Sequence, residues 1–239
     1  MTSMVTNDIR GDISLVLNFY KAFGFESLPL DSADTDKEAA LMALRHEIGD
    51  CRRCKLSKGR TNLVFGEGNP NARIMFVGEA PGREEDKEGR PFVGEAGQLL
   101  TRLINKMGED LGFERKDVYI ANIAKCRPPG NRDPEADEIE TCLPFLKKQI
   151  AIISPEIIVS LGKISAHTML GRSGPFNSFF ITKERGKFGE YRDGEISIPV
   201  MPTFHPAYLL RTPSDKVKTW SDAQAVLKLL KHPAMRGMI

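Results

Sequence analysis

Acidic side chains surround a glycine-rich turn in the first half of this sequence. The stretch VGEAPGREEDKEGRPF follows a short apolar run and carries Glu79 and Glu85 close to Gly78. A phosphate-binding loop would read G-x-G-x-x-G or end in Gly-Lys-Ser/Thr, and neither pattern is present. We therefore expect the turn to bind something other than a nucleotide phosphate, with Glu79 pointing into a ligand crevice.

Polar and aromatic side chains also stand near the ends of later apolar runs. His205 ends the run IPVMPTF, and Asn122 and Asn131 lie at and after the end of VYIANIA. An asparagine amide offers a donor and an acceptor together, which suits it to reading a base. Phe92, among Gly, Pro and Arg, can stack on a planar ligand. Each of these residues also has a structural interpretation, as a turn cap or a core residue.

Four cysteines could hold a metal. Cys51 and Cys54 form a Cys-x2-Cys pair among arginines and lysines, and Cys126 and Cys142 follow after gaps of 71 and 15 residues. Basic surroundings do not favour the burial of uncoordinated thiols, whereas four thiolates hold a structural zinc ion or a [4Fe–4S] cluster. The spacing favours metal coordination over free buried thiols and leaves zinc and iron open.

The apolar pattern predicts the scaffold that positions these residues. Four short β-branched runs, RIMFVG, VYIANIA, EIIVSLG and IPVMPTFHP, alternate with helical segments. Such runs are typical of parallel strands buried on both faces of an α/β sheet. Ligands of these sheets bind beyond the carboxyl ends of the strands, which is where Glu79, Asn122 and His205 fall.

Helical spacing is predicted for five segments of the main domain and for one before it. The five are residues 37–50, 97–106, 135–153, 163–170 and 220–231. Asp193-Gly194 is a hairpin signal. A helix over residues 12–25 and a polar linker after it lead us to treat residues 1–37 as an extension and 38–239 as the domain.

Composition sets the protein class. The 239 residues are 41% hydrophobic and 28% charged, as in ordinary globular proteins, and no run approaches the roughly 20 apolar residues of a membrane helix. The first residues, MTSMVTNDIRGD, lack the basic and apolar parts of a secretory signal, so we expect a cytoplasmic protein. A net charge of +2 is compatible with a nucleic-acid partner without indicating one.

Taken together, the motifs resemble those of the uracil-DNA glycosylase superfamily, and in particular its family 4, the iron–sulfur enzymes. The resemblance runs from about residue 44 to about residue 231. It is carried by GEAPGREEDKEGRPFVGEAGQLL, NIAKCRPPGNRDP, HPAYLLR and the four cysteines. It implies a three-layer α/β/α sandwich on a central four-stranded parallel sheet, to which the helical pattern of residues 12–25 adds an N-terminal extension. It also implies a [4Fe–4S] cluster rather than zinc, held by Cys51, Cys54, Cys126 and Cys142.

The resemblance assigns a role to each candidate residue. Phe92 would stack on a flipped uracil, Asn122 would bind its Watson–Crick edge, and His205 would face its O2 atom. The residues implied in catalysis are Glu79, Glu85, Asn131 and His205. The residues implied in substrate binding are Gly78, Ala80, Phe92 and Asn122. The residues implied in entering the minor groove of DNA are Pro206, Leu209, Leu210 and Arg211.

Two positions depart from related families. In the family 1 motif G-Q-D-P-Y, an Asp credited with positioning water stands in the place of Ala80. A sister group that links covalently to DNA has a reactive His near Asn131, and CRPPGNRDP contains none. We therefore expect ordinary hydrolysis with release of the base.

The predicted function is that of a monomeric DNA repair enzyme. It would flip uracil out of double- or single-stranded DNA and hydrolyse the N-glycosidic bond, leaving an abasic site. A sliding clamp or a single-strand-binding protein is a candidate partner. Two alternatives stay open: a non-catalytic DNA-binding accessory module, and a glycosylase for another base such as hypoxanthine or mispaired thymine.

Overall fold

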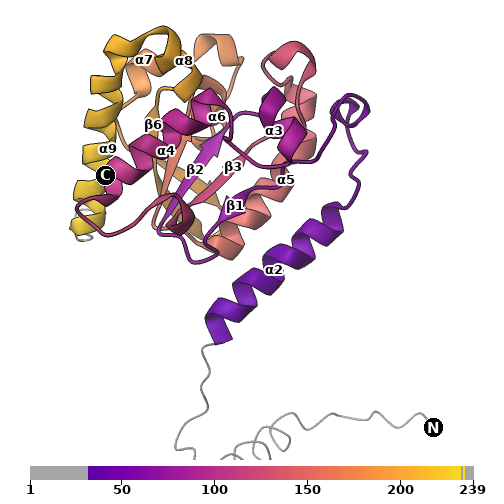
Figure 1. Cartoon of the computed structure of the whole chain (residues 1–239), viewed down its shortest axis with the longest axis horizontal. Coiled ribbons are helices and arrows are strands. Elements are labelled where there is room, and N and C mark those ends of the chain that lie inside the picture. Colours follow the sequence, from indigo (N-terminus) through magenta and orange to yellow (C-terminus); the bar gives the residue numbers. More distant parts are fainter. Residues whose placement is uncertain (1–31, 233, 235–239) are drawn as a thin grey trace, which may run out of the picture. The chain divides into compact units, whose positions relative to one another are not determined.

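The computed structural model describes residues 32–232 and 234 of the chain (Figure 1). The chain divides after Asp36, and the description below concerns the unit that begins at Lys37. The helix predicted over residues 12–25 lies outside the described residues. That helix and the domain boundary at residue 37 stay predictions.

Six strands form one mixed sheet, in the order β1-β3-β2-β4-β6-β5. Their bounds are Glu67–Gly68 (β1), Ile74–Gly78 (β2), Tyr119–Asn122 (β3), Ile157–Leu161 (β4), Gly189–Asp193 (β5) and Ile196–Thr203 (β6). The four central strands β3, β2, β4 and β6 run parallel to one another. The edge strands β1 and β5 pair antiparallel.

The sheet is therefore larger than the four-stranded parallel sheet that the sequence predicted. The four apolar runs are its central strands, and two antiparallel edges were not counted. β1 has only two residues and β5 alternates between buried and exposed positions, so neither forms an unbroken apolar run. Short edge strands limit pairing with other chains. The hairpin signal at Asp193-Gly194 is confirmed, since Asp193 pairs with Ile196 across the β5–β6 turn.

Eight α-helices are present in the described part of the chain. They are Ser32–Ile48 (α2), Arg83–Glu88 (α3), Glu95–Gly108 (α4), Ala136–Ile153 (α5), Lys163–Met169 (α6), Ile181–Glu184 (α7), Pro206–Arg211 (α8) and Lys216–Lys231 (α9). Short 3-10 helices cover Lys55–Lys58, Arg115–Asp117, Pro129–Asn131, Phe176–Ser178 and Pro213–Asp215. Within the described residues, no helix is long and apolar enough to cross a membrane.

Two apolar clusters, one on each face of the sheet, form the core. Met75 and Val77 of β2 pack in one cluster with side chains of α2, α5 and α6. Ile74 and Phe76 pack in the other cluster with side chains of α4 and α9. Because successive strand residues face opposite sides, burial of both sets makes β2 apolar throughout. Helices thus cover both faces of the sheet.

The parallel strands end together at one edge of the sheet. Gly78 is paired with Asn122, and Leu161 with Thr203, at the ends of neighbouring strands. Residues that follow these four positions are thereby brought to one place, although they are far apart in the sequence.

Candidate active site

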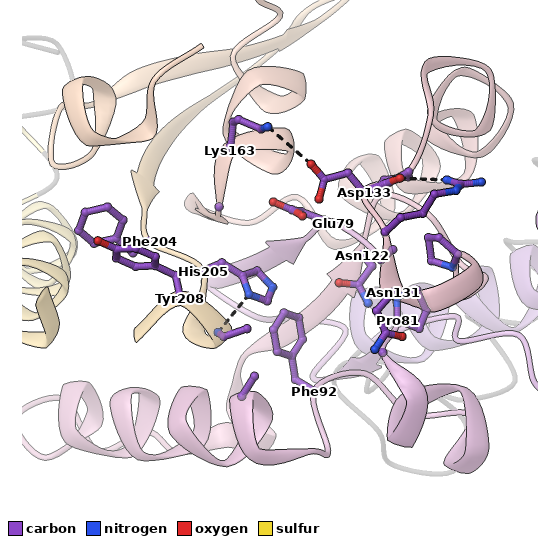
Figure 2. Close-up of a pocket in the computed structure, with 18 of the residues that line it drawn as sticks. Glu79, Pro81, Phe92, Asn122, Asn131, Asp133, Lys163, Phe204, His205 and Tyr208 are labelled. Atoms are coloured by element: carbon purple, nitrogen blue, oxygen red, sulfur yellow. Dashed lines mark hydrogen bonds and ion pairs between the residues drawn. The ribbon is translucent and has the colours of Figure 1, made fainter. Parts of the chain in front are cut away.

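A cavity of about 510 Å³ lies beyond the carboxyl ends of the parallel strands. Figure 2 shows side chains from separate loops turned toward its interior. The predicted site residues that line it are Glu79, Ala80, Glu85, Phe92, Asn122, Asn131, His205 and Arg211. Gly78 lies directly beneath it, between Asn122 and Phe92. The predicted Pro206, Leu209 and Leu210 are not among the residues that line the cavity.

Glu79 and His205 approach one another across a glycine. Glu79 follows β2, His205 follows β6, and Gly162 follows β4, the strand between them. A Cβ atom on Gly162 would lie 2.6 Å from Glu79 Oε1 and 3.1 Å from the Cβ of His205. Gly162 also has a φ of 93°, in the left-handed region. A glycine here is what lets the two functional side chains share one cavity.

The Glu79 carboxylate lies in a largely desolvated position. It accepts a hydrogen bond of 3.4 Å from the backbone N–H of Ile164. Burial raises the pKa of Glu79 to about 7, and the nearby charge of Asp133 adds to this, while the Ile164 N–H and Lys163 oppose it. Lys163 Nζ lies 3.5 Å from Asp133 Oδ2 at the same wall (Figure 2). A carboxyl group poised near neutral pH suits a general base.

His205 is held as a neutral imidazole. It caps α8, and its Nδ1 atom accepts a hydrogen bond of 3.2 Å from the backbone N–H of Ala207. Burial lowers the pKa of His205 to about 4, and the charge of Arg211 lowers it further, against Glu85 and Asp133. With Nδ1 accepting, the proton of the neutral ring is on Nε2. His205 therefore offers one N–H donor for a ligand.

Asn122 and Phe92 form a flat polar and aromatic corner of the cavity. Asn122 is 1% exposed, and its Oδ1 atom has no hydrogen-bond partner among the described residues. A Cβ on Gly78 would lie 2.6 Å from Phe92 Cζ and would also collide with Asn122 Oδ1. The Phe92 ring lies 5.7 Å from that of His205, between ring centroids. An unpaired buried acceptor is costly, so the corner is complementary to a ligand donor.

The acidic residues of the glycine-rich turn have separate tasks. Glu85 Oε1 accepts hydrogen bonds from the backbone N–H groups of Val93 (2.9 Å) and Gly94 (3.0 Å). These bonds fix the loop on which Phe92 adopts an unusual φ of 52°. Asp86 is buried and accepts from the backbone N–H groups of Thr61 and Asn62. Glu85 lines the cavity while holding Phe92 in place, whereas Asp86 is structural.

The remaining predicted residues lie at the rim or beside it. Asn131 is exposed, and its Oδ1 accepts a hydrogen bond of 2.7 Å from Arg127. In α8, Pro206 and Leu209 are buried, and both line an apolar pocket between α4, α8 and α9. Leu210 is 38% exposed, and Arg211 is exposed at the cavity.

Sequence reasoning missed several residues of this cavity. Lys163, Asp133 and Tyr208 line it but were not predicted as site residues. Lys163 comes just after the end of β4, so the rule that selected Glu79 and His205 could have found it. Asp133 and Tyr208 gave no comparable signal, because neither directly follows a strand. Each lies in a motif from which other residues were selected.

The four cysteines line a second, separate pocket. All four are free, and they come from the segment after α2, the segment after β3 and the middle of α5. Their sulfur atoms accept hydrogen bonds from Arg53 (3.3 Å, Cys51), Arg60 (3.2 Å, Cys126) and the backbone N–H of Lys125 (3.3 Å, Cys142). In the part of the chain described, no three His, Cys, Asp or Glu side chains form a site for a single metal ion.

A buried lysine links the cysteine pocket to the cavity. Lys125 is 1% exposed and stands between Asn122 and Cys126 in the chain. Its Nζ donates to the backbone oxygen of Asn122 (2.7 Å) and to Gln149 Oε1 (2.6 Å). The backbone turn beneath Asn122 is thus fixed by the same residue whose N–H contacts Cys142.

Comparison with known proteins gives consistent matches. The family model described as the uracil DNA glycosylase superfamily matches residues 65–229, a range that contains all six strands. The chain is 53% identical to the type-4 uracil-DNA glycosylase of Sulfurisphaera tokodaii, over 81% of this chain and 86% of that one. Identity is 52% with the type-4 enzyme of Saccharolobus solfataricus, over 70% and 76% of the two chains. It is 46% with that of Thermotoga maritima, over 76% and 89%.

The protonation of His205 is directly measurable. We expect its ring resonances in NMR spectra to be constant from pH 8 to about pH 5.5 and to titrate with a midpoint near 4. Arg211→Ala should raise the pKa of His205, because a nearby cation opposes the imidazolium. His205→Gln assigns the signal by its loss. A midpoint near the ordinary value of about 6.5 would contradict a neutral donor in the resting site.

Proposed function

This chain belongs to the uracil-DNA glycosylase superfamily, and on that premise we propose that it removes uracil from DNA by hydrolysing the N-glycosidic bond. The product is an abasic site and free uracil. The observation that carries the proposal is the unpaired Asn122 Oδ1 beside the Phe92 ring, in a cavity shared with Glu79 and His205. A flat ligand with one N–H and one carbonyl group on its edge fits that corner, and uracil is such a ligand.

Base recognition would use three side chains of the cavity: Phe92, Asn122 and His205. Uracil flipped out of the stack lies on the Phe92 ring, and its N3–H donates to Asn122 Oδ1. His205 Nε2–H donates to the O2 atom, because Nδ1 is occupied by Ala207. The N3–H contact would give Asn122 Oδ1 the hydrogen-bond partner that it lacks among the described residues.

Bond cleavage separates charge, and the site is arranged for that separation. As the bond between N1 and C1′ breaks, the sugar becomes cationic and the base anionic. The neutral His205 donor stabilises negative charge at O2, as donors of an oxyanion hole do. The ionised Glu79 orients a water molecule at C1′ and stabilises the cationic sugar. Glu85 acts through Phe92, whose loop it holds.

The rim of the cavity contacts the DNA. Leu210 is exposed and fills the space that the flipped nucleotide leaves, while Arg211 binds a phosphate. Leu209 is buried between α8, α4 and α9 and anchors α8 to the rest of the domain. The exposed cations Arg52, Arg53 and Lys58 add sequence-independent phosphate contacts.

We propose that Cys51, Cys54, Cys126 and Cys142 hold a [4Fe–4S] cluster. Four sulfurs around one pocket, with N–H donors to three of them, fit the environment of such a cluster. The cluster ties the segment after α2 to β3 and α5, so its role is structural.

Substitutions in the cavity test the function. His205→Ala and Glu79→Ala should each lower the single-turnover rate of uracil release by ~10²-fold or more, as loss of one oxyanion-hole donor does. The assay uses a uracil-containing oligonucleotide, with thymine- and hypoxanthine-containing oligonucleotides in parallel. Lys116→Ala, in the 3-10 helix that precedes β3 at the opposite edge of the sheet, is the control. Near-normal rates in both cavity variants would refute the assigned roles.

The pH dependence of the rate tests the role of the Glu79 carboxylate. If its ionised form acts, the single-turnover rate rises with pH, with a midpoint near pH 7. Lys163→Ala removes a stabilising cation and should move the midpoint to higher pH, whereas Asp133→Asn should move it to lower pH. A profile that is the same in the parent and both variants would exclude Glu79 as the titrating group.

The metal content distinguishes the two readings of the cysteines. We expect protein purified without oxygen to contain about four iron atoms and to absorb visible light, as Fe–S clusters do. Cys126→Ser and Cys142→Ser should lower the iron content and the melting temperature, because the cluster joins three segments. Stoichiometric zinc in place of iron would overturn the proposed cofactor.

A further inference from the structure

We propose that Phe180 and Lys183 form a second DNA-binding element at the mouth of the cavity. In this element Phe180 stacks on the base next to the flipped uridine in the same strand, and Lys183 binds a phosphate. This inference rests on the proposed function, because it needs a DNA strand threaded past the cavity. None of the motifs that indicated the enzyme family includes these two residues.

The exposure of Phe180 is the first observation. Four large apolar side chains are exposed in the described part of the chain: Met42, Phe180, Leu210 and Val217. Phe180 is 56% exposed, and exposed aromatic rings often mark binding surfaces. Phe180 directly precedes Ile181, and Leu210 directly precedes Arg211; both of these neighbours line the cavity. Two of the four exposed apolar residues therefore flank one opening: Phe180 directly before α7 and Leu210 in α8.

The segment that carries Phe180 is anchored on both sides. The preceding residue, Phe179, is buried, and its ring lies edge-on to that of His167, with centroids 5.6 Å apart. On the other side, Arg185 forms an ion pair with the buried Asp222 and donates to the backbone oxygen of Lys218. A ring held between two such anchors loses little conformational freedom on binding, which favours affinity.

Charge at this element suits a nucleic-acid strand. Lys183 Nζ lies 5.1 Å from the centroid of the Phe180 ring, and Lys183 forms no ion pair with any described residue. The neighbouring Glu184 is paired with Arg172. An unpaired cation beside an exposed aromatic ring is the combination that single-strand-binding surfaces use for phosphate and base.

The position of Phe180 beside the cavity indicates which base it would contact. Ile181 and Thr182 form part of the wall of the cavity, and Arg211 lines the same cavity from α8. The strand that supplies the uridine must continue past this wall. A flanking base of that strand is therefore within reach of Phe180.

Binding assays test the element without turnover. The probe is a single-stranded oligonucleotide with one 2′-fluoro-2′-deoxyuridine, whose fluorine slows cleavage by destabilising the cationic sugar. Phe180→Ala should raise the Kd by about tenfold, within the range for loss of one stacked base, while Phe180→Trp should keep the affinity. Met42→Ala is the matched control for loss of an exposed apolar side chain. Equal melting temperatures show that the fold is intact.

Two further measurements separate stacking and charge. The second probe is the same oligonucleotide without the base on one side of the modified uridine. The parent protein should bind this probe more weakly than the complete oligonucleotide, whereas the Phe180→Ala variant should bind the two equally. Lys183→Ala should reduce the slope of log K against log salt concentration by about 0.7, and Lys116→Ala should leave it unchanged. Equal Kd values for Phe180→Ala and Met42→Ala, or equal penalties for a missing base in parent and variant, would overturn the inference.

The outcome is separable from that of the proposed function. If the parent protein releases no uracil from ordinary uracil-containing DNA, the proposed function is wrong. If it does release uracil but Phe180→Ala binds like the parent protein, only the second DNA contact is wrong.

Discussion

The close approach of three strand ends is the constraint on which the site depends. Glu79, Gly162 and His205 follow three adjacent parallel strands, and the middle residue has no side chain. Gly78 makes the same allowance for Asn122 and Phe92 on the neighbouring side. Both glycines are needed for space, and Gly162 for its backbone conformation as well. The cavity therefore depends on the absence of a Cβ atom at Gly78 and Gly162 as much as on the side chains that line it.

Burial shifts the pKa values of Glu79 and His205 in opposite directions. It raises the pKa of Glu79 and lowers that of His205, so the desolvated cavity disfavours charge on either side chain. Cleavage of a neutral nucleoside creates a cation and an anion. Because little water reaches such a cavity, these charges must be stabilised by protein groups. Under the proposed function, the Glu79 carboxylate and the His205 Nε2–H are the groups that would meet those charges.

The sequence was sufficient for the central strands and for the residues at their ends, because apolar runs and their termini are local patterns. It could not separate Leu209 from Leu210, since which of them is buried depends on the rotation of α8 against α4 and α9. Nor could it show that Glu85 holds the loop of Phe92 while Asp86 holds that of Thr61. Such roles depend on backbone N–H groups that only the fold brings near. The edge strands were missed because β1 has two residues and β5 is half exposed.

Lys125 couples the cysteine pocket to the turn beneath Asn122. Its ammonium group fixes the turn beneath Asn122, and its own backbone N–H contacts Cys142. The segment that carries Asn122 also carries Cys126. A substitution at Cys142 would remove the acceptor of the Lys125 backbone N–H, so its effect should extend to the turn beneath Asn122.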